Sequence, residues 1–332
     1  MTRTKLLLFL ALIALLFSVL FVVACSGGGH SADEHYYLIT ANSKIPYWQA
    51  AHDGVRQAAI KNKIKVEFVG PDTYDPKAQQ EEFRRIVGTK PSGILISPAD
   101  AKLLQPDIDA AIGQGIPVIT IDSDSPDSKR LLFVGTNNYQ AGLMGGRAAV
   151  KAMKGKGNVV VFSLPAQANI NERFSGYQAA FAESPDIKVI DIVDIQGDPR
   201  IAWDKTTEII NKKQPVDAFI CLEALGGKEV ADVLSRNNVK GKTVMAFDAD
   251  EGTLEWIKKG VINATIAQKP YTMAYYGLET LDMIHHNPPG ALDKKYSNDP
   301  FSPLPTFIDT GATLLDSSNV DAYMSARSGA KQ

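Results

Sequence analysis

Pro117-Val118-Ile119-Thr120-Ile121-Asp122 is a short apolar run that ends in a carboxylate, and this unit recurs along the chain. Similar runs occupy residues 36–40, 66–69, 94–96, 118–121 and 132–134. They are nearly all apolar rather than alternating, which indicates strands that are buried on both faces. Amphipathic stretches over 46–61, 76–87 and 101–112 separate them. This alternation predicts a parallel sheet wrapped by helices.

A second series of the same kind begins after residue 158. Its expected strands are 159–162, 189–193, 218–220, 244–247 and 264–267, and its expected helices are 173–182, 201–213, 228–237 and 253–259. Residues 270–285 form one further expected helix, and the proline-rich stretch 287–305 is expected to be irregular. The sequence therefore predicts an α/β fold of two similar Rossmann-like lobes.

Polar side chains stand at or just after the ends of strands in both series. They are Lys44, Ser97, Asp122, Glu223, Asp248 and Gln268, and Arg173 follows the first strand of the second series. Tyr47 and Trp48 add two aromatic rings after the first strand. Because ligands bind beyond the carboxyl ends of parallel strands, these residues predict a polar small-molecule site.

The N-terminal residues have the layout of a secretory leader. Arg3 and Lys5 precede an apolar run over 6–24, which ends at Cys25. Val22-Val23-Ala24-Cys25 resembles the lipobox of bacterial lipoproteins, which implies a signal peptide over 1–24 and lipidation of Cys25. Residues 25–35, which are rich in glycine and serine, would then be a flexible tether outside the cytoplasm, in the periplasm or at the cell surface. An uncleaved membrane helix and an ordinary cleaved signal are the alternatives.

Composition and motif searches exclude several classes of function. The net charge of −2 gives no electrostatic footprint for nucleic acid. Only Cys221 remains besides Cys25, and its apolar surroundings predict a buried, inert thiol. Residues 241–243 and 122–133 lack the glycines or the glutamate of a phosphate loop and a calcium loop. His285-His286 is expected to be a solvated helix end. We therefore expect no metal, no cofactor and no catalytic residues.

Five stretches resemble one family, in the family's order. They are IPYWQAAHDG (45–54), PVITID (117–122), NERFSGY (171–177), AFD (246–248) and ATIAQ (264–268). Together they resemble the type I periplasmic sugar-binding proteins of the ribose-binding-protein-like branch, which share their fold with the ligand domain of lactose-repressor-type regulators. The resemblance implies two lobes joined by a three-stranded hinge, with a sugar enclosed between them and delivered to an ABC importer.

The resemblance also implies domain limits and site residues. The N-terminal lobe would comprise 36–136 plus 269–307, and the C-terminal lobe 137–268 plus 308–330. Asp122, Arg173, Asp248 and Gln268 would contact a monosaccharide or polyol. These side chains suit hydroxyl groups, and Tyr47 or Trp48 suits the apolar face of a sugar ring. We expect a lipid-anchored monomer that meets an ABC transporter permease.

The chain departs from the ribose-binding pattern at several positions. Lys44 precedes the first matching stretch, Ser97 stands in place of asparagine, and Glu223 in place of aspartate. Trp203 is a candidate substitute for a stacking phenylalanine that the chain lacks. Lys44 and Glu223 suggest a different hydroxyl pattern or a charged ligand, so ribose itself is not supported.

Several alternatives remain open at this point. Asp122 and Asp248 could be helix N-caps, Arg173 an exposed first-turn residue, Gln268 a hinge residue and Trp48 a core residue. A sensor that serves a membrane kinase or chemoreceptor would have the same sequence features. A transcription regulator would need a DNA-reading helix pair where the leader stands. A secreted enzyme would have to show turnover on a glycoside.

Overall fold

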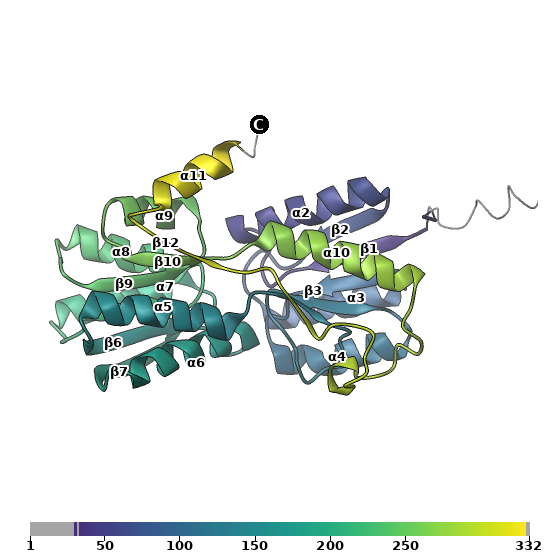
Figure 1. The fold of residues 1–332 in the computed structure, drawn as a ribbon, viewed down its shortest axis with the longest axis horizontal. Coiled ribbons are helices and arrows are strands. Elements are labelled where there is room, and N and C mark those ends of the chain that lie inside the picture. Colours follow the sequence, from purple (N-terminus) through teal and green to yellow (C-terminus); the bar gives the residue numbers. More distant parts are fainter. Residues whose placement is uncertain (1–29, 32, 330–332) are drawn as a thin grey trace, which may run out of the picture.

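Two lobes, each built on a six-stranded sheet, lie side by side in the computed structural model (Figure 1). The structure describes residues 30–31 and 33–329, so the expected leader and Cys25 lie outside the described residues. Within the described part of the chain, none of the helices has the length and apolar character needed to cross a bilayer.

The first lobe contains most of the N-terminal half and a return from the C-terminal part. Its elements are β1 (His35–Ile39), α2 (Pro46–Asn62), β2 (Lys65–Val69), α3 (Pro76–Gly88), β3 (Gly93–Ile96), α4 (Ala101–Gly113), β4 (Val118–Ile121), β5 (Phe133–Gly135), α10 (Pro270–His286), the 3₁₀ helix η1 (Tyr296–Asn298) and β11 (Phe307–Asp309). The strands lie in the order β11-β5-β4-β3-β1-β2, and all of them are parallel. The first series of expected strands is confirmed.

The second lobe has the same plan. Its elements are α5 (Asn138–Met153), β6 (Lys156–Ser163), α6 (Ala168–Ala182), β7 (Asp186–Asp194), α7 (Pro199–Asn211), β8 (Ala218–Cys221), α8 (Gly226–Arg236), β9 (Thr243–Phe247), α9 (Glu251–Lys258), β10 (Ala264–Ala267), β12 (Thr313–Asp316) and α11 (Val320–Gly329). The strand order, β12-β10-β9-β8-β6-β7, repeats that of the first lobe position by position. Only β12 runs antiparallel to its neighbour.

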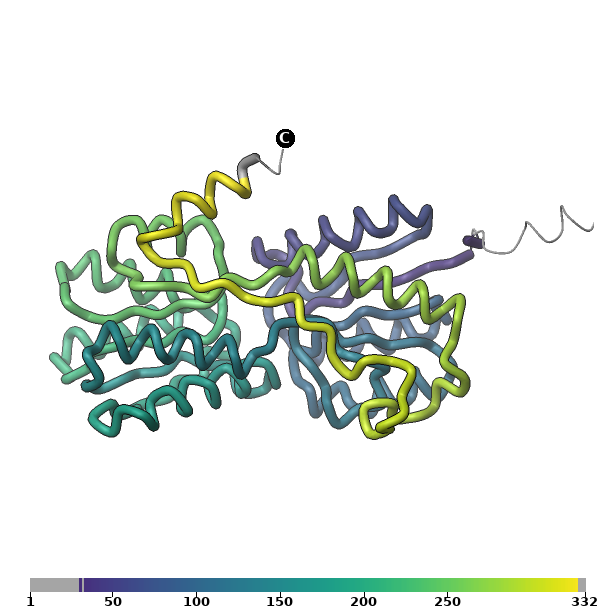
Figure 2. The backbone as a smooth tube through the Cα atoms, viewed as in Figure 1, coloured from purple at the N-terminus to yellow at the C-terminus, as the bar shows by residue number. Residues whose placement is uncertain are grey.

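Three segments connect the lobes, as the tube in Figure 2 makes visible. They run from β5 to α5, from β10 to α10, and from β11 to β12. The middle one contains Gln268 and Lys269, so a predicted site residue lies on a crossing. A three-segment hinge of this kind lets the lobes rotate while each keeps its own core.

The central strands are buried on both faces because helices cover both sides of each sheet. Every residue of β3, β4, β8, β9 and β10 is buried, whereas the edge strands β2 and β7 are partly exposed. Cys221, the last residue of β8, is completely buried, and burial is the main cause that raises the pKa of its thiol. The predicted buried thiol is therefore confirmed.

Three α-helices differ from the sequence prediction, which assigned none at α11 (Val320–Gly329). The sequence analysis assigned no helix between 135 and 158, yet α5 occupies Asn138–Met153. Its three glycines weigh against a helix by propensity, but they allow α6 to pack closely against it. Helix α6 also begins at Ala168, five residues before the expected start at 173, so Arg173 lies in its second turn.

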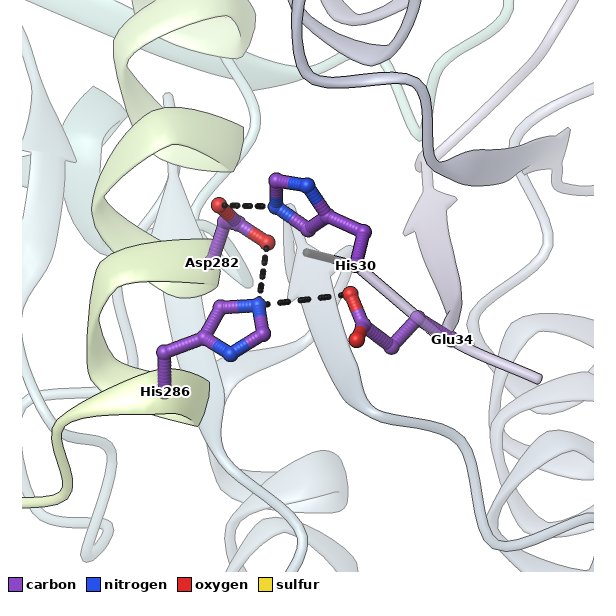
Figure 3. Close-up of side chains that lie close together, drawn as sticks. All are labelled: His30, Glu34, Asp282 and His286. Carbon is purple, nitrogen blue, oxygen red and sulfur yellow. Dashed lines mark hydrogen bonds and ion pairs between the residues drawn. The ribbon is translucent and has the colours of Figure 1, made fainter. Parts of the chain in front are cut away.

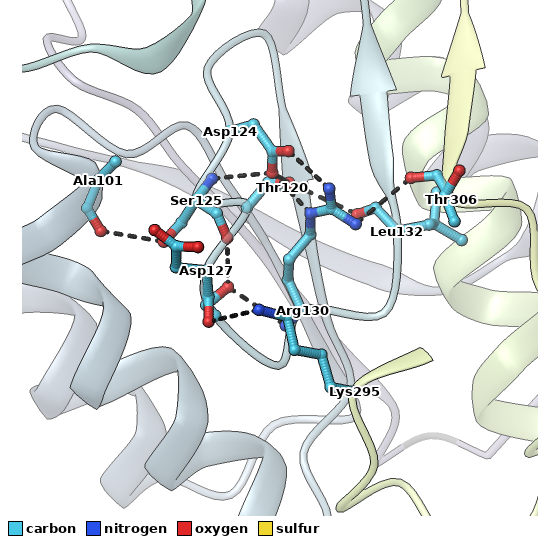
Figure 4. Close-up of polar contacts among 10 residues, drawn as sticks. Ala101, Thr120, Asp124, Ser125, Asp127, Arg130, Leu132, Lys295 and Thr306 are labelled. Atoms are coloured by element: carbon cyan, nitrogen blue, oxygen red, sulfur yellow. Dashed lines mark hydrogen bonds and ion pairs between the residues drawn. The ribbon is translucent and has the colours of Figure 1, made fainter. Parts of the chain in front are cut away.

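The loop after β4 is held by a buried ion pair rather than by a cation (Figure 4). Arg130 donates to both carboxylate oxygens of Asp124 at 2.6 Å, and Thr120 Oγ1 donates to the same group at 2.6 Å. Arg130 also donates to the carbonyl of Thr306 at 3.3 Å. Asp124 therefore ties the loop that carries Asp122 to the strand returning from the C-terminal part of the chain.

Candidate functional site

A cavity of about 60 Å³ lies between the lobes, at the carboxyl ends of both sheets. Side chains from each lobe line it. They are Ala41, Asn42, Ile45, Tyr47, Trp48, Tyr74 and Asp122 from the first lobe and Leu164, Gln167, Asn169, Ile170, Arg173, Gly197, Glu223, Ala224, Leu225, Asp248 and Gln268 from the second lobe and its crossing. A neighbouring cavity of about 260 Å³ shares Tyr47, Asp248 and Gln268 and extends toward α11. The predicted small-molecule site thus corresponds to an interlobe cavity.

Asp122 follows β4 and faces the cavity from the first lobe. Its carboxylate accepts a hydrogen bond from Tyr47 Oη at 2.5 Å and from Ser97 Oγ at 3.4 Å. Burial raises the pKa of Asp122, while Arg173 and these two donors oppose the rise. The chain passes from β4 to β5 without a helix, and the next helix, α5, has Asn137 as its N-cap, so Asp122 is not a helix cap.

Asp248 follows β9 and faces the cavity from the second lobe. Oδ1 of Asp248 accepts from Gln268 Nε2 at 2.9 Å, and Thr265 Oγ1 donates to the Asp248 carbonyl at 2.6 Å. The N-cap of α9 is Asp250, so the cap alternative for Asp248 is wrong as well. Gln268 is both a hinge residue and a cavity residue, because it lies on the crossing and bonds to Asp248.

Arg173 is the cation of the site, and it is 2% exposed. Its guanidinium donates to Asn138 Oδ1, to the Leu222 carbonyl and to Gln268 Oε1, each at 2.9 Å. Its Cζ lies 4.4 Å from the centroid of the Phe247 ring. Three of its five N–H donors are used in this way, which leaves two that can bond a ligand. The alternative of an exposed first-turn residue is therefore wrong.

Close packing of α5 against α6 positions Arg173. A Cβ at Gly142 of α5 would lie 2.0 Å from the Arg173 carbonyl oxygen, a distance that real Cβ atoms do not reach. Glycine at this position lets the two helix backbones approach. The glycines that lower the helix propensity of α5 therefore allow the close packing that places Arg173 at the cavity.

Glu223 stands two residues after β8 and holds the start of α8. Its carboxylate accepts from the backbone N–H of Leu225 at 2.5 Å and of Gly226 at 2.8 Å. Burial raises the pKa of Glu223 to about 7, against the lowering effect of those two backbone bonds and of Arg173. Burial likewise raises the pKa of Asp248 to about 7. Two carboxyl groups beside the cavity therefore titrate near neutral pH.

The two aromatic residues of the first lobe differ in their contacts. Tyr47 directs its hydroxyl to Asp122, and burial together with Asp122 raises the pKa of that hydroxyl well above its ordinary value. Trp48 is 4% exposed and packs in the core of the first lobe, although it also lines the cavity. The core alternative for Trp48 is thus confirmed, and its position beside the cavity is an additional feature.

Three predicted site residues, Lys44, Trp203 and Ser97, do not line the cavity. The Lys44 side chain is 68% exposed and pairs with Asp72 at 3.4 Å on the surface. Trp203 lies on α7, where the guanidinium of Arg236 covers its ring at 5.2 Å. Lys44 and Trp203 lie close to the rim in the sequence. Their distance from a strand end does not determine, however, whether the side chain points into the cavity or to the surface. Ser97 does not line the cavity either, yet it supports Asp122 from below.

Eleven of the lining residues were absent from the predicted set, and four of them are polar: Asn42, Tyr74, Gln167 and Asn169. Asn42 is 7% exposed, and its Oδ1 has no hydrogen-bond partner among the described residues. Tyr74 lies in the loop before α3, and Asn169 is the second residue of α6. The rule that ligands bind beyond strand ends does place Asn42, three residues after β1, and the stretch 167–173 at the rim, but neither Asn42 nor Asn169 was among the expected ligand contacts. No pattern in the sequence marks Tyr74.

The rims of the lobes touch at Tyr74 and Gly197. Gly197 has φ of +72°, and a Cβ there would lie 2.3 Å from the Cβ of Tyr74. A backbone bond from Ala101 N to the Ala166 carbonyl, at 3.3 Å, also joins the two lobes. The structure is therefore a closed arrangement, in which groups from both lobes surround one space. Carboxylates, amides and a guanidinium in that space can bond a ligand that carries several hydroxyl groups.

Comparison with known proteins gives one family. The model of the periplasmic binding protein domain matches residues 36–286. The ribose import binding protein RbsB of Bacillus subtilis is 25% identical over 79% of this chain and 85% of its own. The structure of a sugar ABC transporter sugar-binding protein from Bacillus halodurans is 33% identical, with a TM-score of 0.74 over 87% of this chain and 99% of that one. A chain of the XylFII–LytSN complex is 28% identical, with a TM-score of 0.75 over 87% and 99%.

Proposed function

Because the chain belongs to the periplasmic binding protein family, we propose that it captures a monosaccharide or related polyol between its lobes and delivers it to an ABC importer. The arrangement of Asp122, Asp248 and Arg173 carries the proposal. One carboxylate comes from each lobe, and the buried guanidinium lies beside both. A ligand that bonds both lobes at once stabilises the closed state.

The chemistry of the cavity favours a neutral, hydroxyl-rich ligand. Carboxylates accept hydrogen bonds from hydroxyls, while the guanidinium and amide groups donate to them. Asn42 Oδ1 offers a further acceptor. Relatives that bind ribose and xylose or arabinose support a monosaccharide. Delivery to a permease is supported by the similarity to the sugar-binding protein of a Bacillus halodurans ABC transporter.

A thermal-shift screen of the full chain tests the binding proposal. The panel comprises pentoses, hexoses, inositols and sugar acids, and each hit is measured by titration calorimetry. We expect one class of sugar or polyol to raise the melting temperature, since a ligand that binds only the folded state stabilises it. If no member of the panel raises it, the proposed ligand class is wrong.

We further propose that Cys25 carries the lipid that holds the protein at a bacterial membrane. The leader layout and the residues before Cys25 support this assignment. Metabolic labelling with a radioactive fatty acid should mark the wild-type chain and leave a Cys25→Ser variant unlabelled. Equal labelling of both chains would contradict the assignment.

A second candidate is a ligand sensor that docks on another membrane protein. The similarity to a chain of the XylFII–LytSN complex favours it, because that relative is found with a partner. Deletion of the gene separates the two roles. Loss of uptake of the labelled sugar supports transport, whereas normal uptake with loss of sugar-induced gene expression supports sensing.

A further inference from the structure

We propose that His30, Glu34, Asp282 and His286 form a Zn²⁺ site at the end of the first lobe that is remote from the cavity (Figure 3). Glu34 precedes β1, and His286 is the last residue of α10. The cavity lies at the opposite, carboxyl ends of the strands. One ligand atom from each of the four residues falls within a group whose members lie within 4.8 Å of one another.

The spacing of these atoms fits one small cation. His30 Nε2 lies 3.1 Å from Asp282 Oδ2, and His286 Nε2 lies 3.3 Å from Glu34 Oε2 and 3.5 Å from Asp282 Oδ1. Ligand atoms at about 2.1 Å from a tetrahedral Zn²⁺ are about 3.4 Å apart, so a cation can enter with small side-chain movements. In Figure 3, Asp282 and His286 project from α10 toward His30 and Glu34, and dashed lines join both rings to the Asp282 carboxylate and His286 to Glu34.

Other protein groups hold the two carboxylates in place. Tyr36 Oη donates to Asp282 Oδ1 at 2.9 Å, and the backbone N–H of Ser31 donates to Glu34 Oε1 at 2.6 Å. Such outer bonds orient metal-ligating carboxylates. Glu34 Oε2 is buried and accepts no hydrogen bond from the described residues, although it lies within ion-pair distance of His286. The Glu34 side chain is only 7% exposed. Its Oε2 atom therefore faces the cluster as a buried acceptor that receives no hydrogen bond from the described part of the chain.

The donor set selects the metal. Two imidazole nitrogens and two carboxylate oxygens suit Zn²⁺, whereas Ca²⁺ and Mg²⁺ take oxygen ligands in larger number. The adjacent residue His285 does not belong to the set, because it packs edge-on against the Tyr36 ring at 5.9 Å. Asp282 and His286 lie on the same helix, but His30 and Glu34 come from the segment before β1, and 252 positions separate His30 from Asp282 in the sequence. For that reason the sequence indicated no metal site.

A bound cation would join the start of the folded chain to the end of α10. His30 lies five positions after Cys25, the proposed lipid site. The metal would therefore fix the point where the tether leaves the first lobe. The crossing, the cavity and the second lobe would be unaffected, since none of their residues belongs to the cluster.

The test uses the full chain in detergent, without a histidine tag. Wild type, a His30→Ala/His286→Ala double variant and a His285→Ala control are equilibrated with ZnCl₂, freed of excess metal by gel filtration and assayed for zinc by mass spectrometry. Melting curves are then recorded with and without EDTA. The control removes a histidine from the same helix end but keeps all four proposed ligands.

We expect one zinc per chain in the wild type and in His285→Ala, and loss of it in the double variant. EDTA should lower the melting temperature of the wild type and of His285→Ala, and leave that of the double variant unchanged. Sugar affinity should be the same in all three, which separates this site from the proposed function. Absence of zinc from the wild type, or equal zinc in the double variant, would overturn the proposal.

Discussion

Asp122 and Asp248 occupy equivalent positions in the two lobes and share an unusual backbone conformation. Each follows the third strand in the order of its sheet, and their φ angles are +61° and +69°. Aspartate tolerates this left-handed region better than most residues, because its short side chain can bond locally. The repeat of the fold therefore extends to the two carboxylates that face the cavity. Substitution by asparagine keeps the backbone, whereas alanine adds strain.

The carboxyl groups beside the cavity should make stability depend on pH. The pKa of Asp248 is raised from 3.8 to about 7 in the folded, closed protein, so this state binds a proton that the unfolded chain releases at lower pH. The stabilising effect of that proton is fully present below about pH 4 and is lost as the pH rises through 7. The free energy of unfolding of the sugar-free protein should therefore fall between about pH 4 and 7.

Urea unfolding at several pH values measures this effect, which amounts to at most about 1.4 kcal/mol per pH unit for one group. Asp248→Asn should flatten the decline, because its side chain does not titrate. Glu223 would keep part of the slope, since its pKa is raised to about 7 as well. An unchanged slope in Asp248→Asn would remove Asp248 as a source of the pH dependence.

Arg173→Ala should weaken sugar binding by roughly 1.5–3 kcal/mol, the scale of a charge-assisted hydrogen bond. This corresponds to about 12- to 150-fold in the dissociation constant. Arg147→Ala is the matched control, because Arg147 is exposed on α5. Titration calorimetry gives the affinities, and melting curves show whether the variant is folded despite the three lost hydrogen bonds. Unchanged affinity would exclude Arg173 from the ligand contacts.

Gly197→Ala should impair closure of the lobes. The new Cβ would collide with Tyr74, so the closed state loses stability and the affinity for sugar falls about tenfold or more. Gly260→Ala is the control, since Gly260 has φ of +71° but an added Cβ there would meet nothing within 4 Å. Both variants add the strain of alanine at positive φ, and only the first adds the collision.

Small-angle scattering with saturating sugar should show a larger radius of gyration for Gly197→Ala than for the wild type. Adding Tyr74→Gly removes both the Cβ and the ring that the new Cβ would meet, so it should restore compaction and part of the affinity. If Gly197→Ala and Gly260→Ala bind sugar equally well, the contact between the rims does not control closure.

Arg130→Ala should destabilise the fold by about 3–5 kcal/mol, because it leaves the buried Asp124 carboxylate without its partner. The Arg130 and Asp124 side chains are 7% and 12% exposed. Arg85→Ala removes a comparable but exposed pair with Glu82 and should cost about 0–1 kcal/mol. Chemical denaturation compares the two, and equal losses would show that burial of the Asp124 pair has no energetic consequence.

The sequence predicted the sheets and part of the cavity for one physical reason. A strand buried on both faces must be apolar along its length, and the first polar residue after it lies at the sheet edge. Asp122 and Asp248 follow their strands directly, and Gln268 does so as well. The positions of these three residues at the cavity follow from where their strands end, and the apolar runs in the sequence mark those ends.

Residues away from strand ends were harder to place. Lys44 and Trp203 lie within a few positions of the rim, but each side chain points to solvent or along a helix surface. Tyr74 reaches the cavity because its loop folds across to Gly197 in the other lobe, a contact between positions more than a hundred residues apart. Helix α5 was missed because glycine propensity outweighed the packing of α6, which only the tertiary structure reveals.

The first lobe is not continuous in the chain, because α10 and β11 complete it from residues 270–309. A nascent polypeptide that has reached only β10 lacks the helix that packs on α2 and the edge strand beside β5. Its apolar sheet face stays uncovered until almost the whole molecule has been synthesised. The order of elements along the chain thus delays completion of the first lobe until its last helix and edge strand have been made.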